Sequence, residues 1–283
     1  MSKDQDFTNK DLPQSRLEEI ARLLKYRKKT IILLSLLLLP FILPFFFWLI
    51  YSRYYLYPTL PNSSQAFLYI VLRDYPLIFL SFLMGSGLSG LFYSLKRLLF
   101  RETVRLPYHF FKGIKNTGFE GGLFLSIYSI LFIILDVIQM FSRALFQENK
   151  LRIFGLIIIL ILLLAIAIIL LMSLPFIFSS ISIYVVSFSQ ALRDGFSSEF
   201  RGLGYNLLLF IIFFFPSFFI LSDTGIASQI INLVGASLLT LGFLTIESFV
   251  FLGRALEIFD KNINKSVYPE LYRLGLREEK NES

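Results

Sequence analysis

The chain alternates between long apolar runs and short polar segments that hold most of its Lys and Arg residues. Most of the runs have about the 20 residues that a helix needs to cross the roughly 30 Å hydrocarbon core of a membrane. We therefore expect an all-α fold, a polytopic membrane helix bundle at residues 30–253. A cytoplasmic N-terminal segment (1–29) and a cytoplasmic C-terminal tail (254–283) flank it. The six predicted transmembrane helices are residues 31–50, 77–95, 121–141, 153–190, 207–221 and 230–253.

The fourth run carries no charged residue from 153 to 190. As one helix it would be about 57 Å long, nearly twice the core thickness. It is either one long span that projects into the cytoplasm, bent at Pro175, or a tight hairpin. One span places both termini in the cytoplasm and puts 22 of the 27 Lys and Arg residues on that side. This asymmetry is typical of membrane proteins and favours the single span.

Two short amphipathic or apolar stretches flank the first two spans. Residues 17–24 are expected to form one or two helical turns that lie on the membrane. Residues 66–72 are apolar but too short to cross, and Arg73 and Asp74 follow them directly. We expect this second stretch to be an interfacial or re-entrant turn on the outer side.

Small residues recur at every fourth position of the second span, in the rows Ser81, Gly85, Ser89 and Ser86, Gly90, Ser94. Such rows let two helix backbones approach closely in lipid. Residues 85–90 also match the G-x-G-x-x-G pattern of dinucleotide sites, but no strand precedes them. The sequence therefore predicts helix packing, with Ser81, Gly85, Ser89 and Gly90 in the contact.

A basic segment separates the second and third spans, and before residue 120 it contains only one acid, Glu102. Its cationic residues are Lys96, Arg97, Arg101, Arg105, Lys112 and Lys115. From Pro107 we expect a short helix, ended by Gly118, with His109 at the surface. The segment either docks onto anionic headgroups or an acidic partner, or is a basic loop that only fixes orientation.

Two carboxylates, Asp136 and Glu247, fall inside predicted spans. An ionisable group in the membrane is a functional hypothesis by default, because its exposure to lipid is costly. The two lie near opposite membrane surfaces, so we do not expect them to pair. Each either forms a structural ion pair or belongs to a proton or ion pathway, and the ion pair is favoured. For Glu247 the predicted partners are Lys96, Arg97 or Arg254.

The amino-acid composition excludes several kinds of functional site. The chain has no cysteine and one histidine, which excludes disulfides, thiolate nucleophiles and metal sites of several histidines. The sequence contains no catalytic triad, P-loop or nucleophile elbow, so we expect neither an enzyme nor a cofactor. The net charge of +7 lies at the ends of apolar runs, which indicates a lipid bilayer with anionic headgroups as the partner, and no nucleic acid.

Residues 85–115 resemble the YesL-like family of bacterial integral membrane proteins, whose function is uncharacterised. The similarity lies in GLFYSLK at residues 90–96 and FFKGIK at residues 110–115. Ser86 and His109 depart from it, because the family has a proline and an acidic residue there. Members often accompany carbohydrate-uptake systems of low-GC Gram-positive bacteria. The resemblance therefore implies a multi-pass protein of the bacterial plasma membrane, with membrane transport components as partners.

Two functions follow as hypotheses. The first is a non-enzymatic integral membrane protein, an accessory component linked to carbohydrate uptake. The alternative is a small transporter or channel that uses Asp136 and Glu247. A polar cavity at mid-membrane depth with either carboxylate would favour the transporter. A closed apolar bundle with a basic cytoplasmic face would favour the accessory protein.

Overall fold

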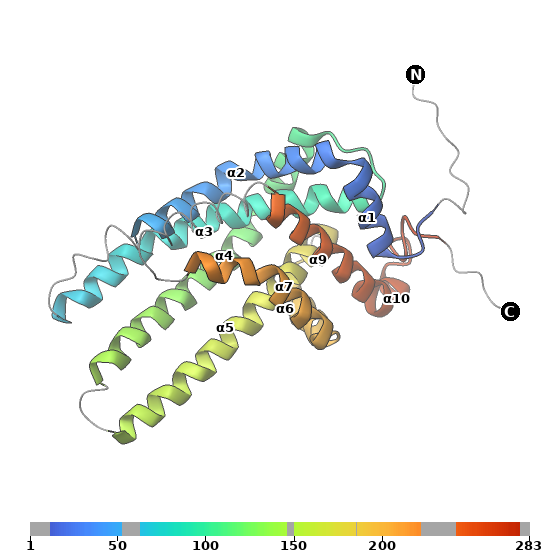
Figure 1. Ribbon diagram of the computed structural model, residues 1–283. Coiled ribbons are helices and arrows are strands. Elements are labelled where there is room, and N and C mark those ends of the chain that lie inside the picture. Colours follow the sequence, from blue (N-terminus) through green and yellow to red (C-terminus); the bar gives the residue numbers. More distant parts are fainter. Residues whose placement is uncertain (1–11, 53–62, 146–149, 185, 222–241, 278–283) are drawn as a thin grey trace.

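The computed structural model describes residues 12–52, 63–145, 150–184, 186–221 and 242–277 (Figure 1). Every regular element within these ranges is helical, so the all-α prediction is confirmed for them. The elements are α1 (Arg16–Tyr26), α2 (Lys28–Tyr51), α3 (Ser63–Leu99), α4 (Leu106–Leu145), α5 (Lys150–Tyr184), α6 (Phe188–Phe200), α7 (Leu203–Leu221), α9 (Leu244–Phe259), the π-helix η5 (Asp260–Asn264) and α10 (Lys265–Val267).

Four of the described helices contain stretches long and apolar enough to cross a membrane, namely Lys28–Tyr51, Asp74–Leu99, Leu106–Leu135 and Ile157–Tyr184. They correspond to the first four predicted spans. The fifth prediction falls on α7. The first half of the sixth lies outside the described residues, and its second half begins α9. The chain therefore has the apolar helices of a membrane protein, while six spans and cytoplasmic termini stay a prediction.

Helix α5 carries an exposed apolar surface of the kind that faces lipid in membrane proteins. Only 18% of its most apolar 18-residue window is buried, and that window has a mean hydropathy of 3.5. Isoleucine and leucine side chains are exposed along much of its length, including Ile161, Leu162 and Leu164. Soluble proteins rarely expose an apolar surface of this extent. In Figure 1 this part of α5 extends away from the rest of the bundle, next to α4.

The structure decides between the two interpretations of residues 153–190. One helix, α5, runs from Lys150 through Pro175 to Tyr184, so there is no hairpin within that range. The helix ends before residue 190, and Lys96 Nζ donates to the carbonyl oxygen of Ser182 at 3.0 Å. A cation at the C-terminus of a helix satisfies carbonyl groups that have no partner within the helix.

Two expected breaks are wrong. Helix α3 continues through residues 66–72 and Pro76, because the supposed stop signal Asp74 is buried against protein. Helix α4 begins at Leu106 as expected but continues past Gly118. Gly118 does not end the helix because its carbonyl group lies in a helix contact, where it accepts a hydrogen bond from Ser86 Oγ at 2.8 Å.

Helices α3 and α4 make the most extensive contact in the described part of the chain. All four predicted packing residues lie in it. A Cβ atom on Gly85 would overlap the carbonyl group of Gly121, and one on Gly90 would lie 2.7 Å from the carbonyl oxygen of Phe110. Ser89 lies against Gly121 as well. Ser81 forms a hydrogen bond with Ser129 through the two hydroxyl groups.

Helices α1, α9 and α10 lie together and close one end of the bundle, the end near the C-terminus of α5 (Figure 1). Helix α1 is present where amphipathic turns were expected, but Ile20 is buried and packs against Gly253 of α9. Arg16 is 1% exposed, pairs with Asp260 at 3.1 Å and donates to the carbonyl oxygen of Leu274 at 2.7 Å. These contacts join the N-terminal segment to the C-terminal tail.

Candidate functional site

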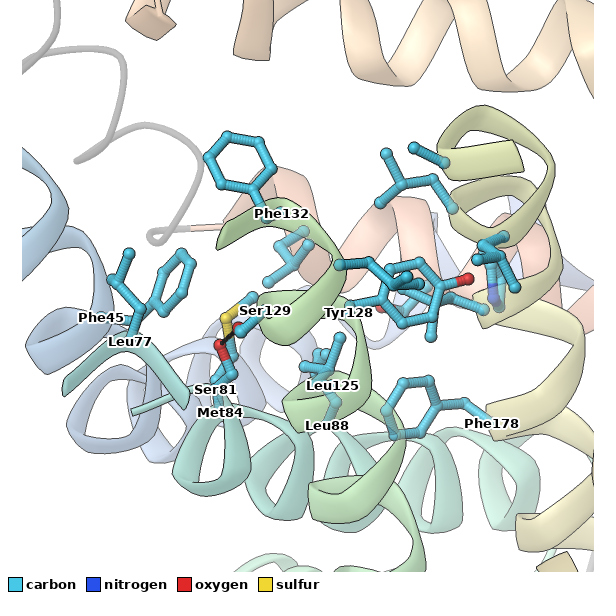
Figure 2. Close-up of a pocket in the computed structure, with 18 of the residues that line it drawn as sticks. Phe45, Leu77, Ser81, Met84, Leu88, Leu125, Tyr128, Ser129, Phe132 and Phe178 are labelled. Atoms are coloured by element: carbon cyan, nitrogen blue, oxygen red, sulfur yellow. Dashed lines mark hydrogen bonds between the residues drawn. The ribbon is translucent and has the colours of Figure 1, made fainter. Parts of the chain in front are cut away.

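A cavity of about 360 Å³ lies inside the helix bundle, between α2, α3, α4, α5, α7 and α9. Figure 2 shows that α2 and α3 form one wall, while α4 and α5 provide Tyr128 and Phe178. Most of the lining is leucine and phenylalanine. The phenylalanines are Phe45, Phe46, Phe92, Phe132, Phe178, Phe210 and Phe251.

Few polar groups reach this cavity, and most of them already have a partner. Ser81 and Ser129 bond to each other, and the Tyr128 hydroxyl lies 3.5 Å from Ser173 Oγ. Glu247 also lines the cavity. Within the part of the chain that the structure describes, Glu247 makes no hydrogen bond or ion pair. Among the described lining residues, Glu247 therefore contributes the only carboxyl group with which a bound molecule would interact.

The ion pair predicted for Glu247 does not form with any of the three expected residues. Lys96 donates to carbonyl groups at the end of α5. Arg97 pairs with Glu102 at 2.8 Å, and Arg254 pairs with Glu257 at 3.0 Å. Each of these three cations is held by another group, so none of them pairs with Glu247. The other predicted carboxylate, Asp136, falls on α4, but its side chain lies outside the described part.

Glu199 at the C-terminal end of α6 is a buried acid that the sequence analysis did not single out. Its exposed fraction is 0%, and neither carboxylate oxygen has a hydrogen-bond partner among the described residues. Burial raises the pKa of Glu199 to about 7. The carboxyl group interacts electrostatically with Tyr128 in the cavity wall. A second acid thus lies behind the cavity, on the side of α6.

One signal in the sequence does point to Glu199. Ala191, Gly195, Ser198 and Glu199 are the buried residues of α6. Their spacing of four, three and one places them on a single helix face. Three small residues before an acid indicate a face that packs closely, and a Cβ atom on Gly195 would overlap Ile177 of α5. The polar segment therefore contains one buried stripe that ends in a carboxylate.

Replacement of Glu199 by glutamine should remove a pH dependence of stability. The folded protein binds the Glu199 proton up to about pH 7, whereas the unfolded chain releases it near pH 4.5. Stability must then fall as pH rises from 4.5 to 7, by up to about 3 kcal/mol, and stay constant above. Unfolding of the purified protein near pH 5 and near pH 8 measures this difference. An equal pH dependence in wild type and Glu199→Gln would contradict the assignment.

The six basic residues of the predicted docking segment do not share one surface. Lys96, Arg97 and Arg101 are held by intramolecular contacts, and Arg101 pairs with Glu19 of α1 at 3.0 Å. Lys96 joins α3 to the end of α5, Arg97 joins α3 to the loop that follows it, and Arg101 in that loop joins it to α1. These contacts close this end of the bundle.

The other three basic residues, Arg105, Lys112 and Lys115, are exposed near the start of α4. Lys112 lies over the ring of Tyr108, with its Nζ atom 5.9 Å from the ring centre. His109 was expected at the surface, but it is buried, with 7% of its surface exposed. It turns inward because its Nδ1 atom accepts the backbone N–H of Arg105 at 2.8 Å, which satisfies a donor at the helix start.

Within the described residues, no three His, Cys, Asp or Glu side chains lie close enough together to hold a metal ion. The fold and the cavity define an all-helical protein with the apolar helices of a membrane protein and a ligand-sized space in its bundle. Comparisons with protein families, with curated proteins and with solved structures find no match to the chain.

Proposed function

We propose that the chain is a small, non-enzymatic transport protein of the bacterial plasma membrane, and that its central cavity holds the molecule it carries. Glu247 in the cavity wall is the observation that carries this proposal. Ionisable residues that face a cavity within a membrane bundle mark substrate and ion pathways in other proteins. The volume of about 360 Å³ falls within the usual range of small-molecule sites.

The character of the lining supports binding rather than catalysis. The hydroxyl groups of Ser81 and Ser129 bond to each other, and the described lining, which also includes Ser248, contains no histidine, lysine or arginine that would activate a nucleophile. Its wall comes from helices on all sides of the bundle. A relative motion of α9 against α3 and α4 would therefore open the cavity, as in the rocking motions of small transporters.

A cysteine placed in the cavity tests transport without knowledge of the substrate. Ser248 is buried, lines the cavity and follows Glu247 on α9, and the chain has no cysteine of its own. We expect Ser248→Cys to react with a membrane-impermeant thiosulfonate added to right-side-out and to inside-out vesicles. Ser94→Cys is the control, because Ser94 is also buried but does not line the cavity. Reaction from one side only, or from neither, would contradict a transport cavity.

The accessory role in carbohydrate uptake is a second candidate. The exposed residues Arg105, Lys112 and Lys115 favour it, because they form a basic patch beside the exposed rings of Tyr108 and Phe111. Such a patch suits anionic headgroups or an acidic face of a transport component. In this case the same experiment should leave Ser248→Cys unlabelled from both sides.

A further inference from the structure

We propose that the molecule held in the cavity is a lipophilic monocation, such as an aromatic amine or a quaternary ammonium compound. This inference rests on the proposed function, because it names the class of molecule that is carried. Its recognition elements are the carboxyl group of Glu247 and the aromatic rings of the surrounding wall.

The first argument is charge. Glu247 has no partner among the described residues, and no basic side chain is found in the described lining. The three residues predicted to neutralise it, Lys96, Arg97 and Arg254, are bound to other groups. The remaining titratable group of the lining is Tyr128, and Glu199 lies behind it. The ionisable groups in and behind the described lining are thus acids without a basic side chain among them, which favours a cation over an anion.

The second argument is the energetic situation of a carboxylate in an apolar wall. A buried ion costs several kcal/mol unless an opposite charge compensates it. A bound cation provides this compensation, whereas a neutral molecule leaves Glu247 to be protonated and an anion adds repulsion. A cationic ligand is therefore the class that gains most from the carboxyl group in the described lining.

The third argument is the wall itself. Phe45 of α2, Phe92 of α3, Phe132 of α4 and Phe178 of α5 contribute rings from four helices. Aromatic faces attract organic cations, typically by 0.5 to about 2 kcal/mol for each desolvated contact. They suit the apolar body of such a molecule as well. A sugar fits this lining poorly, because its many hydroxyl groups would lose their hydrogen bonds to water.

The volume of the cavity limits the size of the bound molecule. A cavity of about 360 Å³ admits a molecule with one or two rings and a small ammonium group. Phenyltrimethylammonium is a suitable probe, and tert-butylbenzene is its neutral isostere with the same shape. The comparison of these two compounds isolates the contribution of the charge.

The test is a binding titration of both compounds with the full chain in nanodiscs of zwitterionic lipid, with empty nanodiscs as reference. Wild type should bind phenyltrimethylammonium about tenfold more tightly than tert-butylbenzene. Glu247→Gln should lose this preference and keep its affinity for tert-butylbenzene, while Glu247→Asp should retain the preference. Ala167→Phe places a phenyl ring in the cavity and should weaken the binding of both ligands. Ala165→Phe, on the exposed side of α5, should behave as wild type.

Each outcome separates the inference from the proposed function. If wild type bound phenyltrimethylammonium and tert-butylbenzene with equal affinity, the preference for a monocation would be wrong, but the cavity would still be a binding site. This comparison needs no variant. A cation preference that survives Glu247→Gln would overturn the role of Glu247. Failure of wild type to bind either compound, or full binding by Ala167→Phe, would overturn the cavity as a site and with it the proposed function.

Discussion

Replacement of Gly85 by leucine is expected to prevent the native packing of α3 on α4. A side chain at this position would overlap the backbone of Gly121, and neither helix backbone can move aside without loss of the other contacts along the pair. Overpacking usually costs about 1–3 kcal/mol, and we expect at least the upper end here because the obstacle is backbone. Thermal unfolding and the monodisperse fraction in gel filtration measure the effect.

Gly155→Leu is the matched control for this experiment. Gly155 lies on α5 with nothing within 4 Å of a Cβ atom, so the added side chain would face the surroundings of the bundle. Its stability should be at least that of wild type, because leucine has a higher helix propensity than glycine by up to about 1 kcal/mol. If Gly85→Leu were as stable as Gly155→Leu, the close contact between α3 and α4 would be wrong.

Replacement of Arg16 by methionine is expected to destabilise the protein by about 3–5 kcal/mol, because it leaves the buried Asp260 without its charged partner. The same change removes the hydrogen bond to Leu274, so the segment after α10 should become more sensitive to protease. Thermal unfolding and limited proteolysis of the purified protein check the two effects.

Glu257→Gln is the control for the loss of an ion pair. Glu257 pairs with Arg254 three residues earlier on α9, and both side chains are partly exposed. Such a pair contributes at most about 1 kcal/mol. Equal losses for Arg16→Met and Glu257→Gln would show that the buried pair does not join the two ends of the chain.

The apolar runs were sufficient to predict the first four spans, because length and hydrophobicity alone decide whether a helix can cross a membrane. The small-residue rows of the second span likewise indicated a close helix contact. The helix that packs against these rows could be predicted from the sequence only in part. Gly121 and Gly122 at the start of the third span are the signal, since both would overlap α3 with any larger side chain.

Contacts between distant parts of the sequence were not predictable in this way. Arg16 and Asp260 lie 244 residues apart, and nothing in their local sequence indicates that they meet. The helix end predicted at Asp74 was wrong for a related reason. A charge in an apolar run indicates a helix end when it must reach water, but a buried position lets α3 continue through it. The failure of Lys96, Arg97 and Arg254 to pair with Glu247 likewise depends on long-range packing.

The most direct test of the central claim is transport through the cavity itself. Proteoliposomes of wild type should take up labelled phenyltrimethylammonium, driven by a membrane potential that is negative inside, faster than empty liposomes. Ala165→Phe should retain this uptake, and Ala167→Phe, whose side chain enters the cavity, should reduce it to the rate of empty liposomes. Uptake by Ala167→Phe at the rate of wild type, or no uptake by wild type, would contradict the account.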